Sequence, residues 1–538
     1  MTVISVEYSD IVDLLGKRFS IEEIRAKTSM IGAADEGVEG ETLSFDISPN
    51  RPDMYSVEGL VRALRGALGL ETGLPQFDVH ESSVRFIVDG SVKPVRPFAV
   101  GGIVRGIEMS DELVKSLMDL QEKLHVTIGR RRKKVAIGIH DMDKVTPPFT
   151  YRGAKPDGVS FVPLGMAGKM TPKEILEVHE KGREYAHILN GSNVCPIIED
   201  SNGTVLSFPP IINGIATALT EDTRNLFIDV TGLDFGAVSS ALNILTTSLH
   251  ERGGRIESVS LELPDTKLRS PDLSTRTKTV SVSNAGKLLG VSLTPRDAAD
   301  FLERMRFGTK VSGDNIEVTI PAYRVDILHE VDLIEDIAIG HGYDKMPLTL
   351  PERATVGNLS DVTSHSRALR EMMVGYGYQE IMSLSMVDPQ MPFKGGASGP
   401  AIVNPVSSEL GGLRSSLLSS LLKILAMNTH RDLPQRVFEV EDVLAGSGNE
   451  RRLAAASIHA KASFTEVKSL VQSVMRDLGR KYELEAGDDP NFIPGRCAFA
   501  VVSGRSVGVL GEIAPQVLEA YGLGYPVAAF EINAELLL

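Results

Sequence analysis

The chain has 538 residues, and a prior of about 150 residues per domain predicts roughly three or four domains. Hydrophobic residues make up 42% of the sequence and charged residues 24%, which excludes a disordered or fibrous protein. The formal net charge of −15 repels phosphate backbones on average, so any contact with nucleic acid must be local. The two cysteines, Cys195 and Cys497, match no metal-binding or redox spacing and exclude a disulfide framework.

The sequence predicts neither an export signal nor a membrane span. The N-terminus carries acidic residues and lacks a basic region followed by an apolar one. The most apolar helical stretch, residues 413–427, contains four serines and a lysine and is too short to cross a bilayer. We therefore expect a cytoplasmic chain without contact with a membrane.

Residues 1–75 predict a mixed α/β domain. Ser20 and Glu23 form the pattern of a capping box, so a helix should begin at about Ile21. Further along, the two prolines of SPNRPDMYS favour a turn, and Ser56 is placed to cap a second helix. The apolar residues after Ser56 recur with the spacing of one buried helix face.

The pattern of the remaining sequence predicts three further domains. Residues 85–262 alternate β-type runs with a helix, which indicates an α/β domain with a mixed sheet. Residues 266–347 combine short helices with a hairpin around a turn at 312–315, which indicates a small winged-helix-like domain. Residues 355–538 contain a helix, a strand at 379–385 and a β-rich end. The predicted fold class is therefore α+β and multidomain.

A group of acidic residues is the best candidate for a metal site. Asp332, Glu335 and Asp336 have the spacing i, i+3 and i+4, so their carboxylates share one helix face, and Asp326 precedes them. Carboxylate oxygens suit Mg²⁺, which usually keeps several waters and leaves room for ligands from a second chain. Acids that stabilise a helix N-terminus through its macrodipole give the same pattern, so both interpretations stay open.

Two other segments are candidates for ligand contact. The longest basic run, RRRKK at 130–134, would suit RNA phosphates, and a solvated loop is the alternative. The segment SFPPIING places Asn213 after two prolines and beside an apolar strand, where it would line a small-molecule pocket or form a structural turn. No phosphate loop, dinucleotide fingerprint or hydrolase motif is present in the sequence.

Several stretches together are similar to one known family. SPNRPDMYSVEGLVRAL resembles the N-terminal segment of phenylalanyl-tRNA synthetase β subunits in their archaeal and eukaryotic-cytosolic form. Residues 85–262 resemble the B3/B4 domain of that family, and PAYRVDILHEVDLIEDIAIGHGYD, within residues 266–347, resembles its B5 domain. VNPVSSELGGLRSSLLSSLL and FIPGRCAFAVVSGRSVGVLGEIAP resemble its C-terminal catalytic-like domain, so the resemblance covers nearly the whole chain.

The resemblance implies a subunit of a class II ligase that uses ATP to join phenylalanine to tRNA(Phe). In the family, an α subunit holds the synthetic site, and the two chains assemble as an α2β2 heterotetramer. The C-terminal β domain is a class II-like antiparallel sheet that has lost its active site. In agreement, residues 438–441 and 508–511 stand in the places of two class II motifs without the arginines of those motifs.

The resemblance also implies two sites on this chain. Asp326, Asp332, Glu335 and Asp336 correspond to ligands of a Mg²⁺ ion shared with the α subunit. The B3/B4 domain implies editing of Tyr-tRNA(Phe), with Asn213 as the leading pocket residue. A scaffold without editing is the alternative, and a free-standing Mg²⁺-dependent hydrolase is disfavoured because no nucleophile or base accompanies the acids. The Leu-rich helix from Leu417 is a candidate assembly surface.

Overall fold

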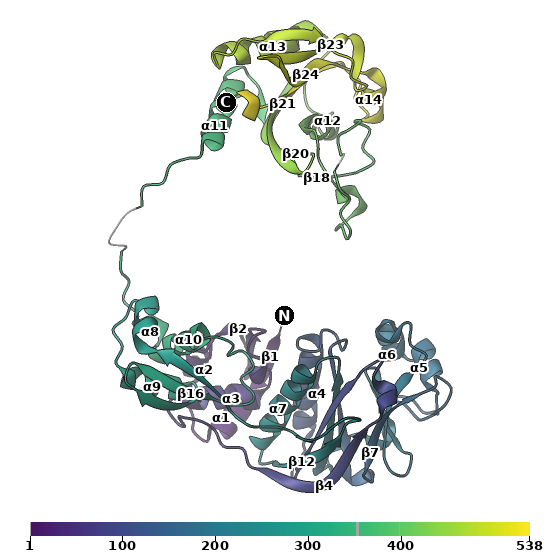
Figure 1. Cartoon of the computed structure of the whole chain (residues 1–538), viewed down its shortest axis with the longest axis vertical. Coiled ribbons are helices and arrows are strands. Elements are labelled where there is room, and N and C mark those ends of the chain that lie inside the picture. Colours follow the sequence, from purple (N-terminus) through teal and green to yellow (C-terminus); the bar gives the residue numbers. More distant parts are fainter. Residues whose placement is uncertain (1, 351–354, 398, 538) are drawn as a thin grey trace. The chain divides into compact units, whose positions relative to one another are not determined.

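The fold is that of a computed structural model, which describes residues 2–350, 355–397 and 399–537. The chain divides into two compact units, Met1–Thr349 and Leu350–Leu538 (Figure 1). Each unit has its own hydrophobic core. Among the helices in the described ranges, none has the length and apolar character needed to cross a bilayer.

The N-terminal unit begins with a three-stranded antiparallel sheet in the order β1-β3-β2, accompanied by three helices. The elements are β1 (Val3–Glu7), α1 (Tyr8–Leu15), α2 (Ile21–Met30), β2 (Ala33–Glu39), β3 (Thr42–Ile47) and α3 (Val57–Ala67). The Ser20 hydroxyl accepts a hydrogen bond from the Glu23 amide at 3.2 Å, and the Glu23 carboxylate accepts one from the Ser20 amide at 2.8 Å. These two bonds confirm the predicted capping box and the start of helix α2.

The middle of this unit is a large mixed sheet in the order β10-β9-β8-β7-β4-β12-β5-β11-β6, with β13 paired to β12. Its strands are β4 (Val79–Val88), β5 (Phe98–Arg105), β6 (Val135–Asp141), β7 (Phe149–Ala154), β8 (Cys195–Glu199), β9 (Val205–Phe208), β10 (Ile212–Asn213), β11 (Asn225–Gly232), β12 (Arg255–Glu262) and β13 (Lys267–Ser270). Strand β4 pairs in parallel with β12 and β7, and the other pairs are antiparallel. The predicted mixed sheet is therefore confirmed.

Four helices belong to this sheet, namely α4 (Asp111–Val126), α5 (Pro172–Val178), α6 (Glu180–Tyr185) and α7 (Phe235–His250). Helix α5 begins after Thr171 and ends at Val178, because His179 adopts an extended backbone conformation. The His179 side chain accepts a hydrogen bond from the Lys181 amide at 3.1 Å and begins a second short helix, α6.

The last part of the N-terminal unit has a three-stranded antiparallel sheet, β14-β16-β15, and three helices. The elements are β14 (Arg276–Ser281), α8 (Val282–Leu289), α9 (Pro295–Arg304), β15 (Gly308–Ser312), β16 (Asn315–Ile320) and α10 (Glu330–His341). The pairing of Ser312 with Asn315 confirms the predicted hairpin. The acidic residues of the sequence lie on and just before α10.

The three parts of the N-terminal unit share one hydrophobic core. Phe45, Leu245 and Ile337 come one from each part, and all three are fully buried in the same cluster. The first two parts are also joined by Arg252, whose guanidinium pairs with Asp10 and Glu58 at 2.6 Å each. Residues 2–349 therefore behave as one folded body, although the sequence suggests three segments.

The C-terminal unit is a seven-stranded sheet in the order β17-β20-β21-β25-β24-β23-β22, with a separate pair β18-β19. Its elements are α11 (Asp361–Gly375), β17 (Gln379–Glu380), β18 (Met386–Val387), β19 (Gly412–Leu413), α12 (Leu417–Met427), β20 (Gln435–Ala445), β21 (Gly448–Ile458), α13 (Phe464–Asp477), β22 (Glu483–Ala486), β23 (Phe492–Val502), β24 (Arg505–Ile513), α14 (Pro515–Ala520) and β25 (Val527–Asn533). Helices α11 and α13 contribute to the core on one face, and α12 and α14 to the core on the other. All neighbours except β17 and β20 are antiparallel, as expected for the predicted sheet.

Two expectations for this unit differ from the structure. The strand predicted at 379–385 pairs only at Gln379–Glu380, because the Ser383 amide donates to the Glu439 carboxylate at 3.1 Å instead of to a neighbouring strand. The Leu-rich helix α12 is not an exposed surface of this unit. Its leucines Leu417, Leu418, Leu421, Leu422 and Leu425 are buried in the core, so the helix is needed for the fold itself.

Helix α3 packs unusually close to the turn Pro52–Met54 of the SPNRPDMYS segment. A Cβ atom added to Gly59 would lie 1.7 Å from the backbone oxygen of Asp53. The same Asp53 accepts two hydrogen bonds from Arg51, at 2.9 Å each. Only glycine fits at position 59, and the close contact fixes the turn that carries Arg51.

We predict that Gly59→Ala destabilises the N-terminal unit by about 3 kcal/mol or more, because the backbone must move to admit the methyl group. The measurement is urea unfolding followed by circular dichroism, since the chain has no tryptophan. Gly236→Ala, in helix α7 of the same unit, is the matched control, because the nearest atom to a Cβ there is a side-chain oxygen of Asp234 at 3.4 Å, an ordinary contact. A Gly59→Ala protein with the urea midpoint of the parent would contradict this packing.

Candidate functional site

The four acidic residues predicted as metal ligands come together in the structure. Asp332, Glu335 and Asp336 project from helix α10, and Asp326 lies on the loop before it. All four line one cavity of about 150 Å³, which Arg324 also lines, together with Arg51 and Asn50 from the segment before α3. The cavity thus joins the beginning and the end of the N-terminal unit.

Arg324 occupies the centre of this group and was missed by the sequence analysis. Its guanidinium is 2% exposed and donates to Asp326 at 2.9 and 2.7 Å and to Asp336 at 2.6 Å. The ring of Phe307 lies 4.7 Å from the guanidinium carbon. The only sequence signal for this arrangement is a basic residue two positions before Asp326.

The buried pairs shift the pKa values of their members. Burial opposes the charge of Arg324, but Asp336 and Asp326 outweigh it and hold the arginine pKa well above its usual value. Burial also acts to raise the pKa of Asp326, but Arg324 and Arg51 outweigh it and lower that pKa. For Asp336, burial prevails and raises the pKa. The two aspartates thus share one arginine in unequal surroundings.

The other two acids are in different situations. One Asp332 carboxylate oxygen accepts hydrogen bonds from the amides of Leu328 at 2.7 Å and His329 at 2.6 Å, so this residue caps helix α10. The helix-capping interpretation therefore applies to Asp332. Glu335 is exposed, and its side chain has no hydrogen bond or ion pair with another described residue. Within the described ranges, no three potential protein ligands surround a common metal position.

A second cavity, of about 380 Å³, lies in the large mixed sheet. Helix α4 and strands β6, β9, β10 and β11 all contribute to its lining, and Asn213 belongs to β10. The backbone oxygen of Asn213 accepts a hydrogen bond from Leu164 at 2.9 Å, whereas its side-chain amide has no bond to another described residue. The candidate pocket residue therefore lines a real cavity with its amide available.

Two more polar residues line this cavity, and sequence reasoning missed both. Ser207, opposite Asn213 in the β9–β10 pair, is 2% exposed, and its buried hydroxyl has no partner within the described part of the chain. Asp229 on β11 is 1% exposed and pairs with the fully buried His140 at 2.7 Å. A polar residue inside an apolar strand is the signal that would have marked Asp229 and His140.

The His140 ring is held on both sides. Its Nδ1 lies 2.7 Å from the Thr217 hydroxyl and its Nε2 lies 2.7 Å from the Asp229 carboxylate. There is no room for a side chain on the neighbouring strand, since a Cβ on Gly138 would lie 2.2 Å from an Asp229 oxygen. This packing fixes the Asp229 carboxylate at the cavity wall.

Helix α4 forms another wall of the cavity. His125 Nε2 accepts a hydrogen bond from the Ile137 amide at 2.8 Å, so the proton of the neutral ring is on Nδ1, 3.2 Å from the Glu122 carboxylate. Burial lowers the pKa of His125. The hydrogen bond from His125, together with Arg132, lowers the pKa of Glu122 to about 2. His125 is therefore neutral and Glu122 charged near pH 7.

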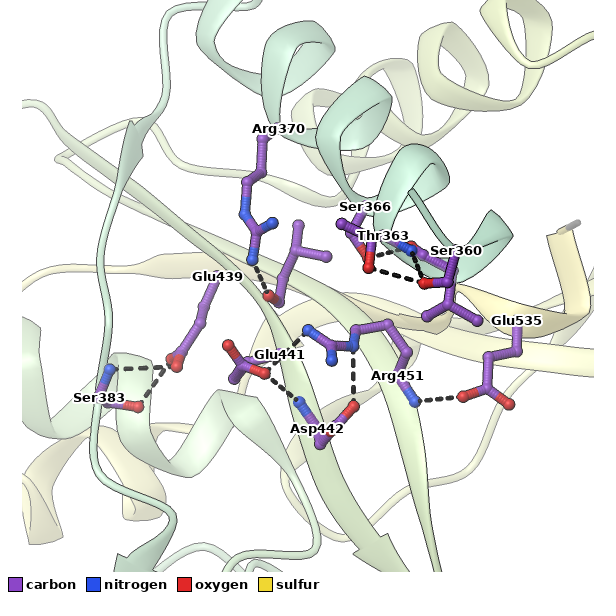
Figure 2. Close-up of polar contacts among 12 residues, drawn as sticks. Ser360, Thr363, Ser366, Arg370, Ser383, Glu439, Glu441, Asp442, Arg451 and Glu535 are labelled. Atoms are coloured by element: carbon purple, nitrogen blue, oxygen red, sulfur yellow. Dashed lines mark hydrogen bonds and ion pairs between the residues drawn. The ribbon is translucent and has the colours of Figure 1, made fainter. Parts of the chain in front are cut away.

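Polar side chains also pair around strand β20 in the C-terminal unit, as Figure 2 shows. The buried Glu439 accepts hydrogen bonds from the Ser383 hydroxyl at 2.7 Å and from the fully buried Arg414 at 2.9 Å. Further along the strand, Arg451 pairs with Glu441 at 2.8 Å (Figure 2). The two glutamates of residues 438–441 are therefore neutralised within this unit.

Three family models match the chain. They are the phenylalanyl tRNA synthetase beta chain CLM domain at residues 346–534, the tRNA synthetase B5 domain at 278–343 and the B3/4 domain at 105–258. The first cavity is bordered by the B5 match, and the second lies mainly within the B3/4 match.

Curated relatives match along their whole length. The phenylalanine–tRNA ligase beta subunit of Methanococcoides burtonii is 43% identical over 99% of both chains. That of Methanosarcina barkeri is 44% identical over 99% of this chain and 98% of the relative. An N-terminal fragment of the phenylalanyl-tRNA synthetase beta subunit of Pyrococcus horikoshii, solved as a crystal structure, is 40% identical and covers 63% of this chain and 99% of the fragment, with a TM-score of 0.61. The resemblance found in the sequence is confirmed, and the chain belongs to the family of phenylalanine–tRNA ligase beta subunits.

Proposed function

We propose that this chain works with an α subunit as a cytoplasmic ligase that joins phenylalanine to tRNA(Phe), converting ATP to AMP and diphosphate. The observation that carries the proposal is the similarity to archaeal beta subunits along 99% of the chain. The α subunit would hold the synthetic site, in an α2β2 heterotetramer. The beta chain would contribute assembly, editing and Mg²⁺ ligands.

An exposed apolar edge supports the proposal of a partner. Met382, Leu384 and Met386 alternate along the segment after β17, and the first two are 87% and 65% exposed. Ser383, between them, is held by Glu439, so the methionine and leucine side chains face away from the sheet. An edge segment with a row of exposed apolar side chains is typical of a protein interface. We propose this segment, rather than helix α12, as a contact of the α subunit.

The cavity in the mixed sheet suits editing of Tyr-tRNA(Phe). Asn213, Ser207 and Asp229 bring an amide, a hydroxyl without a partner and a carboxylate to an otherwise largely apolar lining. These groups are able to bind the phenol hydroxyl of tyrosine, which phenylalanine lacks. A site built to bind a hydroxyl rejects the analogue without it by a factor of about 10⁴ or more.

The editing reaction is the hydrolysis of an ester. Water adds to the carbonyl carbon that links tyrosine to the tRNA ribose, and the bond from that carbon to the ribose oxygen breaks. The oxygen of water stays with the tyrosine carboxylate, one proton of the water passes to the ribose oxygen to form its hydroxyl, and the other is released to solvent. In this proposal Asn213, Ser207 and Asp229 bind and orient the tyrosine.

The acidic cavity suits Mg²⁺ by the chemistry of its donors, because four carboxylates and the Asn50 amide line it. Asp332 and Glu335 each have an oxygen that Arg324 does not occupy. We propose that these two are the carboxylates most open to the ion, and that Asp326 and Asp336, which Arg324 now holds, complete the site by exchanging that pairing for the ion. Bound there, Mg²⁺ supplies positive charge and coordination positions for ligands from the α subunit.

The first prediction concerns the partner. The lone chain should not charge tRNA(Phe) with phenylalanine, and co-expression with its α subunit should give a 2:2 complex that does. Native mass and charging rate measure both properties. Met382→Ser/Leu384→Ser should weaken the complex, whereas Leu288→Ser, at another exposed leucine, should not. Charging by the lone chain would contradict the proposal.

The second prediction concerns editing. In the complex, Asn213→Ala should slow hydrolysis of Tyr-tRNA(Phe) by about tenfold, which corresponds to the loss of one hydrogen bond, and should leave phenylalanine charging unchanged. Asn202→Ala is the control, because that amide is exposed and has no side-chain bond. An unchanged rate would rule out Asn213. A parent complex that does not hydrolyse Tyr-tRNA(Phe) would instead favour the scaffold without editing.

The third prediction concerns the metal. Asp332→Ala/Glu335→Ala should lower the Mg²⁺ content of the complex, measured by elemental analysis, or weaken its assembly. Asp332→Asn/Glu335→Gln should act in the same way while keeping an oxygen that caps helix α10. Asp300→Ala/Glu317→Ala, at two exposed acids of the same region, is the control. Metal content equal to that of the parent in both acidic-site variants would reject the site.

A further inference from the structure

The basic run at 130–134 forms a turn with an unusual backbone. Arg130, Arg131 and Arg132 all have positive φ angles, of 47°, 54° and 65°. Residues with a Cβ rarely adopt this conformation, and three in succession are costly in free energy. Such strain persists only where the surrounding structure imposes it, and it concentrates at functional sites.

The surrounding structure holds the turn through Arg132. The Arg132 side chain donates to Glu122 at 2.9 Å and to the backbone oxygen of Ile211 at 3.0 Å. Its guanidinium also lies 4.6 Å from the centre of the Tyr185 ring. Ile211 is two residues before Asn213, so one arginine ties the turn to the cavity segment that carries Asn213. We call residues 130–133 the arginine turn.

The remaining cations of the arginine turn face solvent. Arg130, Arg131 and Lys133 are exposed, and none of them forms an ion pair or a side-chain hydrogen bond with another described residue. This is notable in a chain with a net charge of −15, in which carboxylates outnumber cations. Arg132 and Lys181 line the cavity itself and pair with Glu122 and Glu184. The excess positive charge therefore comes from the three exposed cations next to Arg132, although the chain as a whole is acidic.

We propose that the arginine turn binds the phosphates of the single-stranded 3′ end of an aminoacyl-tRNA and so directs its ester into the cavity. This inference rests on the proposed editing function. Arg130 and Arg131 are exposed while Arg132 lines the cavity, so one turn is able to contact both the polyanionic strand and the pocket. Arginine suits this task because its planar guanidinium binds phosphate oxygens in pairs.

The test compares two substrates in the α–beta complex. One is Tyr-tRNA(Phe), and the other is tyrosine esterified to the ribose of adenosine, which has the same ester but no phosphate. The variant is Arg130→Asn/Arg131→Asn, because asparagine tolerates the left-handed conformation and carries no charge. Arg130→Lys/Arg131→Lys keeps the charge, and Arg296→Asn/Arg505→Asn removes two exposed arginines elsewhere.

We expect the asparagine variant to raise KM for Tyr-tRNA(Phe) by about tenfold near 0.15 M salt and to reduce the salt dependence of log kcat/KM by about 1.4, the value for two lost phosphate contacts. Hydrolysis of the adenosine ester should stay at the parent rate, which shows that the pocket is intact. The lysine variant should retain most of the binding, and the control pair should match the parent. The melting temperature of the asparagine variant should not fall.

Three results would overturn the inference in distinguishable ways. If the parent hydrolyses both substrates and the asparagine variant does so with the same KM and salt dependence, the arginine turn is a solvated loop. If the parent hydrolyses neither substrate, the editing function itself fails, and the inference fails with it. Equal loss on both substrates would place the effect in the pocket and also reject a role in phosphate binding.

Discussion

The pairing of Arg324 with Asp326 and Asp336 is the interaction on which the acidic site depends. A buried guanidinium without a partner is costly, so this arginine requires both carboxylates. These contacts join the loop before α10 to the helix itself. Arg51, next to the turn at Pro52–Met54, lines the same cavity. The same interaction lowers the negative charge of the cavity, because two of its four acids share one arginine and the other two have no arginine partner in the described part of the chain. Any cation that binds in this cavity therefore binds at a site of moderate negative charge.

The large mixed sheet also buries polar side chains, and only some of them have partners. Asp229 is buried, and His140 holds it from one side while Gly138 leaves the space that it needs. Ser207 and Asn213, on two paired strands, have no such partners and face the same cavity. A buried hydroxyl without a hydrogen bond is costly to the folded chain. That cost is relieved when a ligand supplies the missing bond, which is how a pocket gains selectivity for a hydroxyl group.

Local features of the fold were predictable from the sequence, and long-range features were not. The capping box at Ser20 and Glu23 and the hairpin turn at 312–315 depend on neighbouring residues, so their signals are contained in a few positions. The burial of helix α12 could not be read in this way, because an amphipathic helix looks the same whether it meets its own sheet or another chain. The family resemblance came from long specific segments, and it also covered the four acids and Asn213. It assigned no role to Arg324, Ser207 or Asp229, although the similar segments contain them, because their roles arise from contacts with residues distant in the sequence.

The division of the chain at residue 349 has a thermodynamic consequence. Each unit buries its own core, so the two need not unfold together, and a single free energy of unfolding does not describe the whole chain. As a result, a substitution that destabilises the C-terminal unit need not lower the free energy of unfolding of the N-terminal unit. The cavities proposed for editing and for Mg²⁺ lie in one of these cooperative blocks and the exposed apolar edge in the other. Substitutions in the exposed apolar edge are thus able to accumulate without changing the stability of the unit that contains the two cavities.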